Sequence, residues 1–264
     1  MYQLKEIPSE AAIRKFLRRI LFGRNIFCPE CRSRDTLVYE TRYRCRVCRC
    51  KFSLLSHTWL SHLRLPLQEF WLILWCWTTQ IPIRQTEALT GLSGKGVRHW
   101  YDIFRSHLPK DKTVLEAIIQ LDEAYFGGWK GRTLLMGKQA GTRKIAYTIL
   151  PHTNPARIDA YQFVKEYINS NSKIYTDGNP IYKELDLPIT HESEIHKQFE
   201  YTKTSETEGL FGVLRTFIRR MYHHVTVEKF PDYMSEFYFR FSHPEMFKSP
   251  RYFLTKTLYL VPIG

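Results

Sequence analysis

The hydrophobic pattern is helical over roughly the first 110 residues of the chain. Residues 11–21 form an amphipathic repeat with a basic face, which predicts a surface helix. Residues 67–79 are strongly apolar and too short to span a bilayer, so we expect a buried helix there. Residues 83–105 predict a short helix, a turn at Gly91 and a second helix capped by Ser93. This spacing is typical of a helix-turn-helix.

Beyond residue 110, β-like and helical patterns alternate, which predicts an α/β fold with a mixed sheet. Strands are expected at residues 113–121, 144–150 and 172–176. Helices are expected at residues 159–168, from Glu208 onward, and at residues 230–241. The connection through residues 159–168 is long enough for parallel pairing of the strands on either side.

Three acidic residues occupy informative places in this pattern. Asp122 and Asp177 follow apolar strands and precede Gly-containing breakers, so we expect both at strand ends. Glu208 is expected to open a helix on its inward face. Three converging carboxylates suit hard divalent cations that keep open positions for phosphates. Two such ions about 4 Å apart can serve an in-line displacement at phosphorus, as in nucleic-acid cleavage or transfer. Taken singly, each acid could equally be an ordinary turn or cap residue.

Two Cys-x-x-Cys pairs, separated by 13 residues, are the strongest local signal. Four thiolates at this spacing predict a tetrahedral zinc site, formed by Cys28, Cys31, Cys45 and Cys48. Disulfides or a redox pair are the alternatives, and both fit two knuckles in an intracellular-looking chain poorly. Cys50 is a spare thiol close enough to confuse the ligand assignment, and Cys76 fits a core position.

Positive charge is concentrated in the N-terminal part of the chain. The formal net charge is +13, and residues 1–110 hold 19 Lys and Arg against 8 Asp and Glu. Such an excess favours a polyanionic partner. Arg residues and aromatics are interleaved around the cysteines, a composition that suits nucleic acid although it could also dock a protein. The predicted DNA contacts are Arg44, Arg46 and Arg49 in the ribbon and Lys95, Arg98 and His99 in the second helix of the helix-turn-helix.

These patterns divide the chain into four predicted parts. They are a basic N-terminal helix (1–24), a zinc ribbon (25–56), a helical helix-turn-helix module (57–110) and a catalytic domain (111–264). The N-terminus lacks a signal-peptide pattern, so we expect a cytoplasmic, nucleoid-associated protein with no membrane partner.

Together these residues resemble a known family. The resemblance rests on these motifs: CPEC and CRVC at the two cysteine pairs, Leu121–Gly128, Tyr175–Gly178, and Glu208-Gly209 followed by Tyr222–Val225. In this order they resemble the zinc-ribbon DDE transposases of bacterial insertion sequences, a group related to the eukaryotic Merlin elements. The similarity extends from about Phe27 to Ser242.

The resemblance implies an RNase H-like catalytic domain that binds two magnesium or manganese ions, in addition to one structural zinc. Asp122, Asp177 and Glu208 would be the metal-binding acids, and Arg215 stands where the family mostly has Lys. Family members often have Asn three positions before the third acid, where this chain has Ser205, so an auxiliary contact made by that Asn is in doubt. Glu206 is close enough in sequence to compete with Glu208.

The sequence thus predicts a DNA transposase that binds terminal inverted repeats and target DNA and catalyses strand cleavage and strand transfer. A homodimer or larger assembly on double-stranded DNA is expected, since two ends must be joined. A catalytically silent DNA-binding derivative and an RNase H-like nuclease without strand transfer remain the alternatives.

Overall fold

A computed structural model describes residues 7–127, 131–183, 185, 187–193 and 204–261. The chain forms two compact units, Arg105–Pro244 and the combination of Met1–Phe104 with Glu245–Gly264. The division at Arg105 lies close to the predicted domain boundary. The end of the chain differs from the prediction, because residues after Pro244 group with the N-terminal unit and not with the sheet.

The N-terminal unit begins with α1 (Glu10–Phe22), whose first turn is capped by Ser9. A small antiparallel sheet follows, made of β1 (Thr36–Tyr39), β2 (Arg42–Cys45) and β3 (Lys51–Ser53). A sheet this small buries little apolar area, so its stability depends on packing against its neighbours and on the cysteine site. Phe52 supplies part of that packing, stacking between Tyr43 and Phe22.

Helices complete this unit. They are α2 (Leu67–Thr78), α3 (Ile83–Thr90), α4 (Gly94–Ser106), the 3-10 turn η5 (Pro244–Phe247) and α8 (Pro250–Thr257). Gly91 ends α3 at φ 72°, a left-handed conformation that favours glycine. Trp77 of α2 packs against Phe253 of α8 with ring centroids 5.0 Å apart. This aromatic packing explains why the C-terminal segment joins the N-terminal unit.

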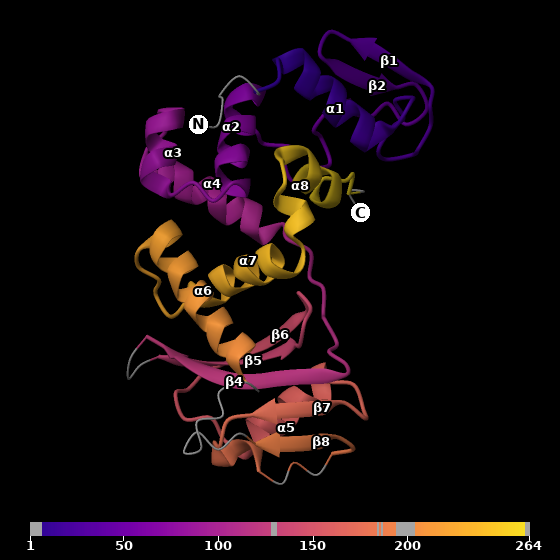
Figure 1. Cartoon of the computed structure of the whole chain (residues 1–264). Helices are drawn as coiled ribbons and strands as arrows, with labels where there is room; N and C mark the ends of the chain where they lie inside the picture. The colour runs from indigo at the N-terminus through magenta and orange to yellow at the C-terminus, as the bar shows by residue number, and fades with distance from the viewer. Residues whose placement is uncertain (1–6, 128–130, 184, 186, 194–203, 262–264) are drawn as a thin grey trace. The chain divides into compact units, whose positions relative to one another are not determined.

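The second unit is built on a five-stranded mixed sheet (Figure 1). Its strands are β4 (Ile118–Phe126), β5 (Arg132–Gln139), β6 (Ile145–Leu150), β7 (Lys173–Thr176) and β8 (Thr190–Ser193). The spatial order is β6-β5-β4-β7-β8, antiparallel on the β5 side of β4 and parallel on the β7 side. This order and these directions are those of an RNase H-like domain, so the predicted fold class is confirmed.

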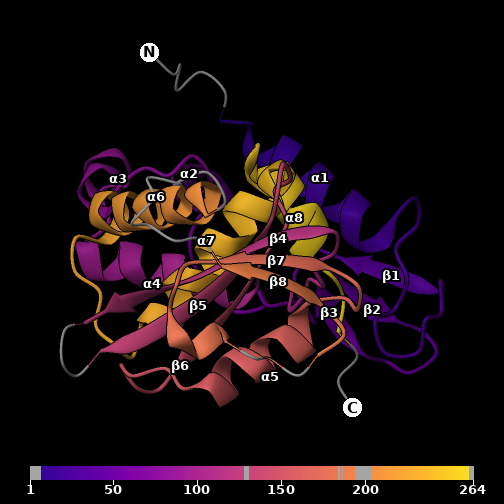
Figure 2. The same ribbon diagram turned by 60° about the horizontal axis from the view of Figure 1, so that its bottom comes forward.

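Helices cover both faces of this sheet (Figure 2). They are α5 (Arg157–Tyr167), the 3-10 turn η3 (Pro180–Tyr182), α6 (Ser205–Tyr222) and α7 (Phe230–Ser242). Phe163 of α5 is buried in one cluster with Ile119 and Leu121 of β4. Gln120 faces the other way, and its Oε1 accepts hydrogen bonds from the first-turn N–H groups of Glu206 and Thr207 in α6. Alternate residues of β4 therefore face α5 and α6.

The structure corrects one strand prediction and adds two strands. The strand expected at residues 113–121 begins at Ile118 and continues to Phe126, because β5 pairs with it along its whole length. The expectation that Asp122 ends its strand is therefore wrong. Strands β5 and β8 were not predicted at all. The last residue of the Leu121–Gly128 motif lies outside the described residues.

No described helix has both the length and the apolar content needed to cross a bilayer.

Candidate metal centres and nucleic-acid interface

Asp122 and Asp177 are brought together by the register of the parallel strands β4 and β7. Ile118 pairs with Lys173 and Gln120 with Tyr175, so the same register places Asp122 level with Asp177. Pairing with β7 stops at Gln120, two residues before Asp122. Asp122 thus lies inside one strand but beyond the end of its parallel neighbour, where Asp177 follows the last residue of β7. The two aspartates share one edge of the sheet.

Glu123 joins them in a cluster that the sequence did not predict. One carboxylate oxygen from each of Asp122, Glu123 and Asp177 lies within 4.8 Å of the others. The Glu123 carboxylate accepts hydrogen bonds from Tyr182 Oη at 2.5 Å and from the Asn179 side-chain amide. Neighbouring strand residues face opposite sides, which argues against pairing Glu123 with Asp122 from sequence alone. Asn179 and Tyr182, which follow Asp177 closely in the sequence, donate the hydrogen bonds that turn the Glu123 carboxylate toward the two aspartates.

Asp122 is the acid of this cluster whose pKa is raised to near neutrality. Burial, followed by the charges of Glu123, Asp177 and Glu208, raises the pKa of Asp122 to about 7. Burial also raises the pKa of Glu123, against the lowering effect of its hydrogen bond from Tyr182. Carboxylates crowded in this way are stabilised by a bound cation. The oxygen donors and their mutual repulsion therefore fit a hard divalent ion such as Mg²⁺.

Glu208 lies on α6 but outside the described cluster of ligand atoms. Its side chain is exposed, and its Oε1 accepts a hydrogen bond from Thr204 Oγ1 at 3.2 Å. The buried face of α6 is formed by other residues, Leu210, Leu214 and Phe217 among them. Glu208 still acts on Asp122 through its charge, on the side of β4 that faces α6.

Glu206 and Ser205 have structural places at the start of α6. The Glu206 carboxylate contacts the Lys138 ammonium and accepts from the Gly141 N–H at 3.2 Å. These contacts lower the pKa of Glu206, chiefly through Lys138. Glu206 therefore has its own partners and is not among the three clustered acids. Ser205 is the exposed first residue of α6.

Arg215 lines a basic cavity of about 310 Å³ next to the end of β4. Its guanidinium carbon lies 5.8 Å from the centroid of the Phe126 ring. Four further basic side chains line the same cavity: Arg132, Arg219, His223 and His224. Arg132 Nε is buried and has no hydrogen-bond partner within the described part of the chain. A cavity of this composition suits an anionic group.

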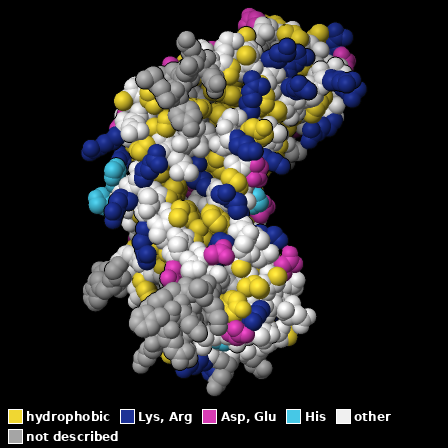
Figure 3. Space-filling view, viewed as in Figure 1, with side chains coloured by type: hydrophobic (Ala, Val, Ile, Leu, Met, Phe, Trp, Pro, Cys, Tyr) yellow, Lys and Arg dark blue, Asp and Glu magenta, His cyan; other side chains and the backbone are white. Residues whose placement is uncertain are grey.

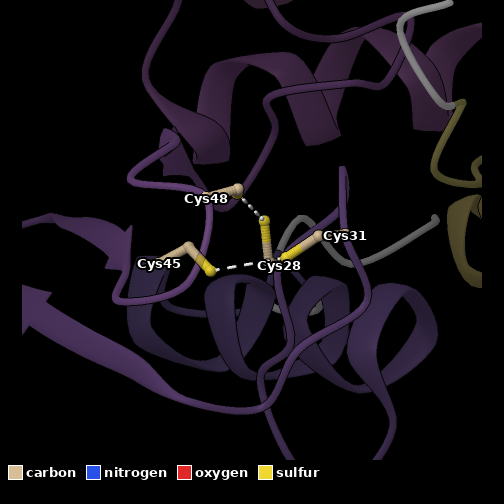
Figure 4. A group of neighbouring side chains, drawn as sticks. All are labelled: Cys28, Cys31, Cys45 and Cys48. Atoms are coloured by element: carbon tan, nitrogen blue, oxygen red, sulfur yellow. Dashed lines mark hydrogen bonds between the residues drawn. The ribbon is translucent and has the colours of Figure 1, made fainter.

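The four predicted zinc ligands do converge in the ribbon (Figure 4). The Sγ atoms of Cys28 and Cys48 are 3.5 Å apart, as are those of Cys31 and Cys45. Four sulfurs at the usual zinc distance stand about 3.8 Å from one another, so the cluster fits a tetrahedral ion. The backbone N–H of Cys48 lowers the pKa of Cys45 to about 7. Against a hydrogen bond from the Cys50 backbone, burial and the neighbouring thiols raise the pKa of Cys48 to about 12.

The predicted nucleic-acid contacts are exposed in the N-terminal unit. Arg44, Arg46 and Arg49 are exposed in and after β2, and Lys95, Arg98 and His99 are exposed in the first half of α4. Arg46 forms a solvent-exposed ion pair with Asp35 at 3.6 Å. A hollow of about 260 Å³ is lined by Arg42, Arg44, Lys51, Tyr39 and Tyr43. Figure 3 shows basic side chains gathered over the ribbon region.

Comparisons with known proteins find a transposase domain and a relative from a transposable element. Residues 114–242, just under half of the chain, match the ISXO2-like transposase domain. An uncharacterized protein in transposable element ISH50 of Halobacterium salinarum is 25% identical over 232 residues, covering 76% of this chain and 79% of the relative.

Two solved structures show a more remote similarity. A chain of the simian T-cell lymphotropic virus intasome in complex with PP2A regulatory subunit B56 gamma is 16% identical, with a TM-score of 0.39 and coverage of 73% and 77% of the two chains. The catalytic core domain of BIV integrase is 13% identical, with a TM-score of 0.32 and coverage of 47% and 82%.

The matched domain and the relative from a transposable element, together with the acidic cluster, support a DNA transposase. The match over residues 114–242 and the relative from a transposable element confirm the resemblance to transposases of insertion sequences.

Proposed function

We propose that this protein is a DDE-type DNA transposase that binds the terminal inverted repeats of its element and cleaves and joins DNA strands. The observation that carries the proposal is the meeting of Asp122 and Asp177 at one sheet edge inside a transposase domain. Two divalent ions at such carboxylates activate an attacking oxygen and stabilise the leaving oxygen of a phosphoryl displacement.

Asp122 and Asp177 would hold the ions from the sheet, and Glu208 would be the third acid. Its charge already acts on Asp122, and the α6 face of β4 is the side from which Glu208 approaches. Glu123 lies on the other side, where Tyr182 and Asn179 fix its carboxylate. We assign Glu123 the role of orienting the aspartates and adding negative charge. Magnesium or manganese would serve here, and one zinc ion would hold the ribbon.

The basic cavity at the end of β4 would guide the substrate strand. Arg215, Arg132 and Arg219 can pair with phosphate oxygens, and a guanidinium does this with directional hydrogen bonds. This arrangement supports a path in which a DNA phosphate enters next to the acidic cluster.

The test is an assay of purified protein with Mg²⁺ and DNA that carries the ends of its element. We expect cleavage and joined products from the wild-type chain and from Asp232→Asn, which alters an exposed acid of α7. Asp122→Asn should give neither product. Repeat binding without breakage would establish the silent DNA-binding alternative, and cleavage without joining would establish the nuclease.

DNA binding by the N-terminal unit has its own test. Lys95 and Arg98 are exposed on the first half of α4, where a recognition helix contacts DNA. We expect Lys95→Ala and Arg98→Ala each to reduce the slope of log K against log salt by about 1 on repeat DNA. Lys248→Ala, which removes an exposed cation from another segment, is the matched control. Unchanged slopes in both α4 variants would remove this helix from the interface.

A further inference from the structure

A second group of metal-binding side chains lies beside the four cysteines of the ribbon. Glu30, Cys50 and His57 each bring one ligand atom within 4.8 Å of the other two. None of the three belongs to the tetrathiolate group. They come from separate segments: the turn of the first knuckle, the residue before β3, and the turn between β3 and the helices.

His57 is held in this group at a conformational cost. Its φ is 64°, in the left-handed region that favours glycine over histidine. Its side chain is only 5% exposed, and Nδ1 lies 3.4 Å from Glu30 Oε1. Nδ1 nevertheless makes no hydrogen bond to any described residue. Burying an imidazole nitrogen without a hydrogen bond is unfavourable unless another partner, such as a metal, takes its lone pair.

The donor set identifies the class of ion. One thiol sulfur, one imidazole nitrogen and one carboxylate oxygen suit a borderline-soft cation, and this combination is poor for Mg²⁺ or Ca²⁺. Three protein ligands with a fourth position for water are an established zinc arrangement. We propose that Glu30, Cys50 and His57 form a second zinc site, distinct from the tetrathiolate site and independent of the proposed catalytic function.

A zinc ion here would cross-link the ribbon to the rest of the N-terminal unit. Glu30 and Cys50 belong to the ribbon, whereas His57 starts the connection toward the helices. The His57 carbonyl also accepts a hydrogen bond from the Val261 N–H at 2.7 Å. The ion would therefore hold the ribbon, through Glu30 and Cys50, to the segment around His57 that binds Val261 near the C-terminus.

The decisive measurement is the number of zinc ions per chain. Full-length protein is dialysed against a small excess of Zn²⁺ in a large excess of Mg²⁺, which occupies the acidic cluster, and bound zinc is counted by elemental mass spectrometry. We expect two ions per wild-type chain and one in Cys50→Ser, Glu30→Gln and His57→Gly. His62→Gly, which removes an exposed histidine nearby, should keep two. One ion in the wild-type chain would overturn the proposal, as would two ions in all three variants.

Cobalt spectroscopy of the wild-type chain adds a measurement that does not depend on how well a variant folds. The first equivalent of Co²⁺ should give the intense bands of a tetrathiolate site. The second should add a weaker sulfur-to-cobalt band, as expected for a single thiolate, that is missing from Cys50→Ser. A second equivalent that adds no sulfur-to-cobalt band to the wild-type protein would exclude Cys50 as a ligand and refute the site.

Discussion

Asp122 links the charge of the acidic cluster to the stability of the fold. The pKa of Asp122 is about 7 in the folded chain, whereas a carboxyl group in an unfolded chain has a pKa near 4. Between these two pH values the folded chain therefore keeps a proton on Asp122 that the unfolded chain has lost. Stability from this residue is therefore fully present below about pH 4 and is lost as pH rises through 7.

We therefore expect Asp122→Asn to stabilise the protein when no divalent ion is present. The gain at pH 8 without added Mg²⁺ should be about 1–3 kcal/mol, discounted from the full pKa shift because the side chain is partly exposed. Urea unfolding at pH 4 and pH 8 measures it, and the gain should vanish at pH 4. Adding Mg²⁺ should stabilise only the wild-type chain. An equal gain at both pH values would show that the carboxylate charge is not responsible.

Glu208 and Glu123 can be separated by their response to magnesium. Glu208→Gln removes a proposed ligand and should lower strand joining at least about 100-fold at any Mg²⁺ concentration. Glu123→Gln removes a supporting charge and should weaken Mg²⁺ affinity about 10-fold, with activity restored at higher Mg²⁺. Joining rates across a Mg²⁺ titration measure both effects. The reverse pattern would make Glu123 the third acid.

Among the elements, strand β4 shows how far the sequence could lead. Its apolar run identified a strand near the acids. The crossover through α5 was also predicted, but it leads from β6 to β7, and β7 pairs with β4 and not with β6. The exact register that levels Asp122 with Asp177 depends on pairing with β7, which no local pattern encodes.

The missed strands and the missed acid have physical reasons. Strand β5 is buried over most of its length and lacks alternation, so its short apolar run carries no period of 2. Strand β8 reads Thr-His-Glu-Ser and is held by backbone pairing to β7. Glu123 reaches the cluster through donors from Asn179 and Tyr182, which are distant in sequence. Tertiary contacts of this kind leave no local signal.

Helix α7 contains a buried charge network that should control the stability of the sheet unit. Glu236 is fully buried, accepts from Tyr222 Oη at 2.6 Å and pairs with Arg105 at 2.9 Å and Arg240 at 2.8 Å. Burial alone would raise the pKa of Glu236, but Arg240 and Arg105 lower it. The two guanidinium groups would lose their common counter-charge without it.

Glu236→Gln should therefore destabilise the chain by about 3–5 kcal/mol, the usual cost of removing one partner from a buried ion pair. Chemical denaturation measured through the sheet unit checks this. Asp232→Asn changes an exposed acid of the same helix and should cost less than about 0.5 kcal/mol. Similar small effects in both variants would mean that the network adds little to stability.

At the scale of the whole molecule, the C-terminal helix belongs to the N-terminal unit. Phe253 of α8 is fully buried against Trp77, and Trp59 Nε1 donates to the Thr257 carbonyl at 3.0 Å. We expect Phe253→Ala to cost about 3–5 kcal/mol in that unit. Hydrogen exchange should rise in α2 and remain unchanged in β4 and β5.

The neighbouring Tyr252 provides the control, since it is 54% exposed on the same helix. Tyr252→Ala should leave hydrogen exchange unchanged throughout the described chain. Increased exchange in β4 with Phe253→Ala would mean that the two units unfold as one.

Because α8 comes last in the sequence but packs in the N-terminal unit, the two units should finish folding in a fixed order during synthesis. A ribosome makes the ribbon and the first helices early, but α8, which fills part of their core, emerges only after the whole sheet unit. The sheet unit can fold as soon as its own residues are released, because domains generally fold as units during synthesis. The segment made first is thus the one that matures last, and a chain interrupted before α8 would carry the acidic cluster alongside an unfinished N-terminal core.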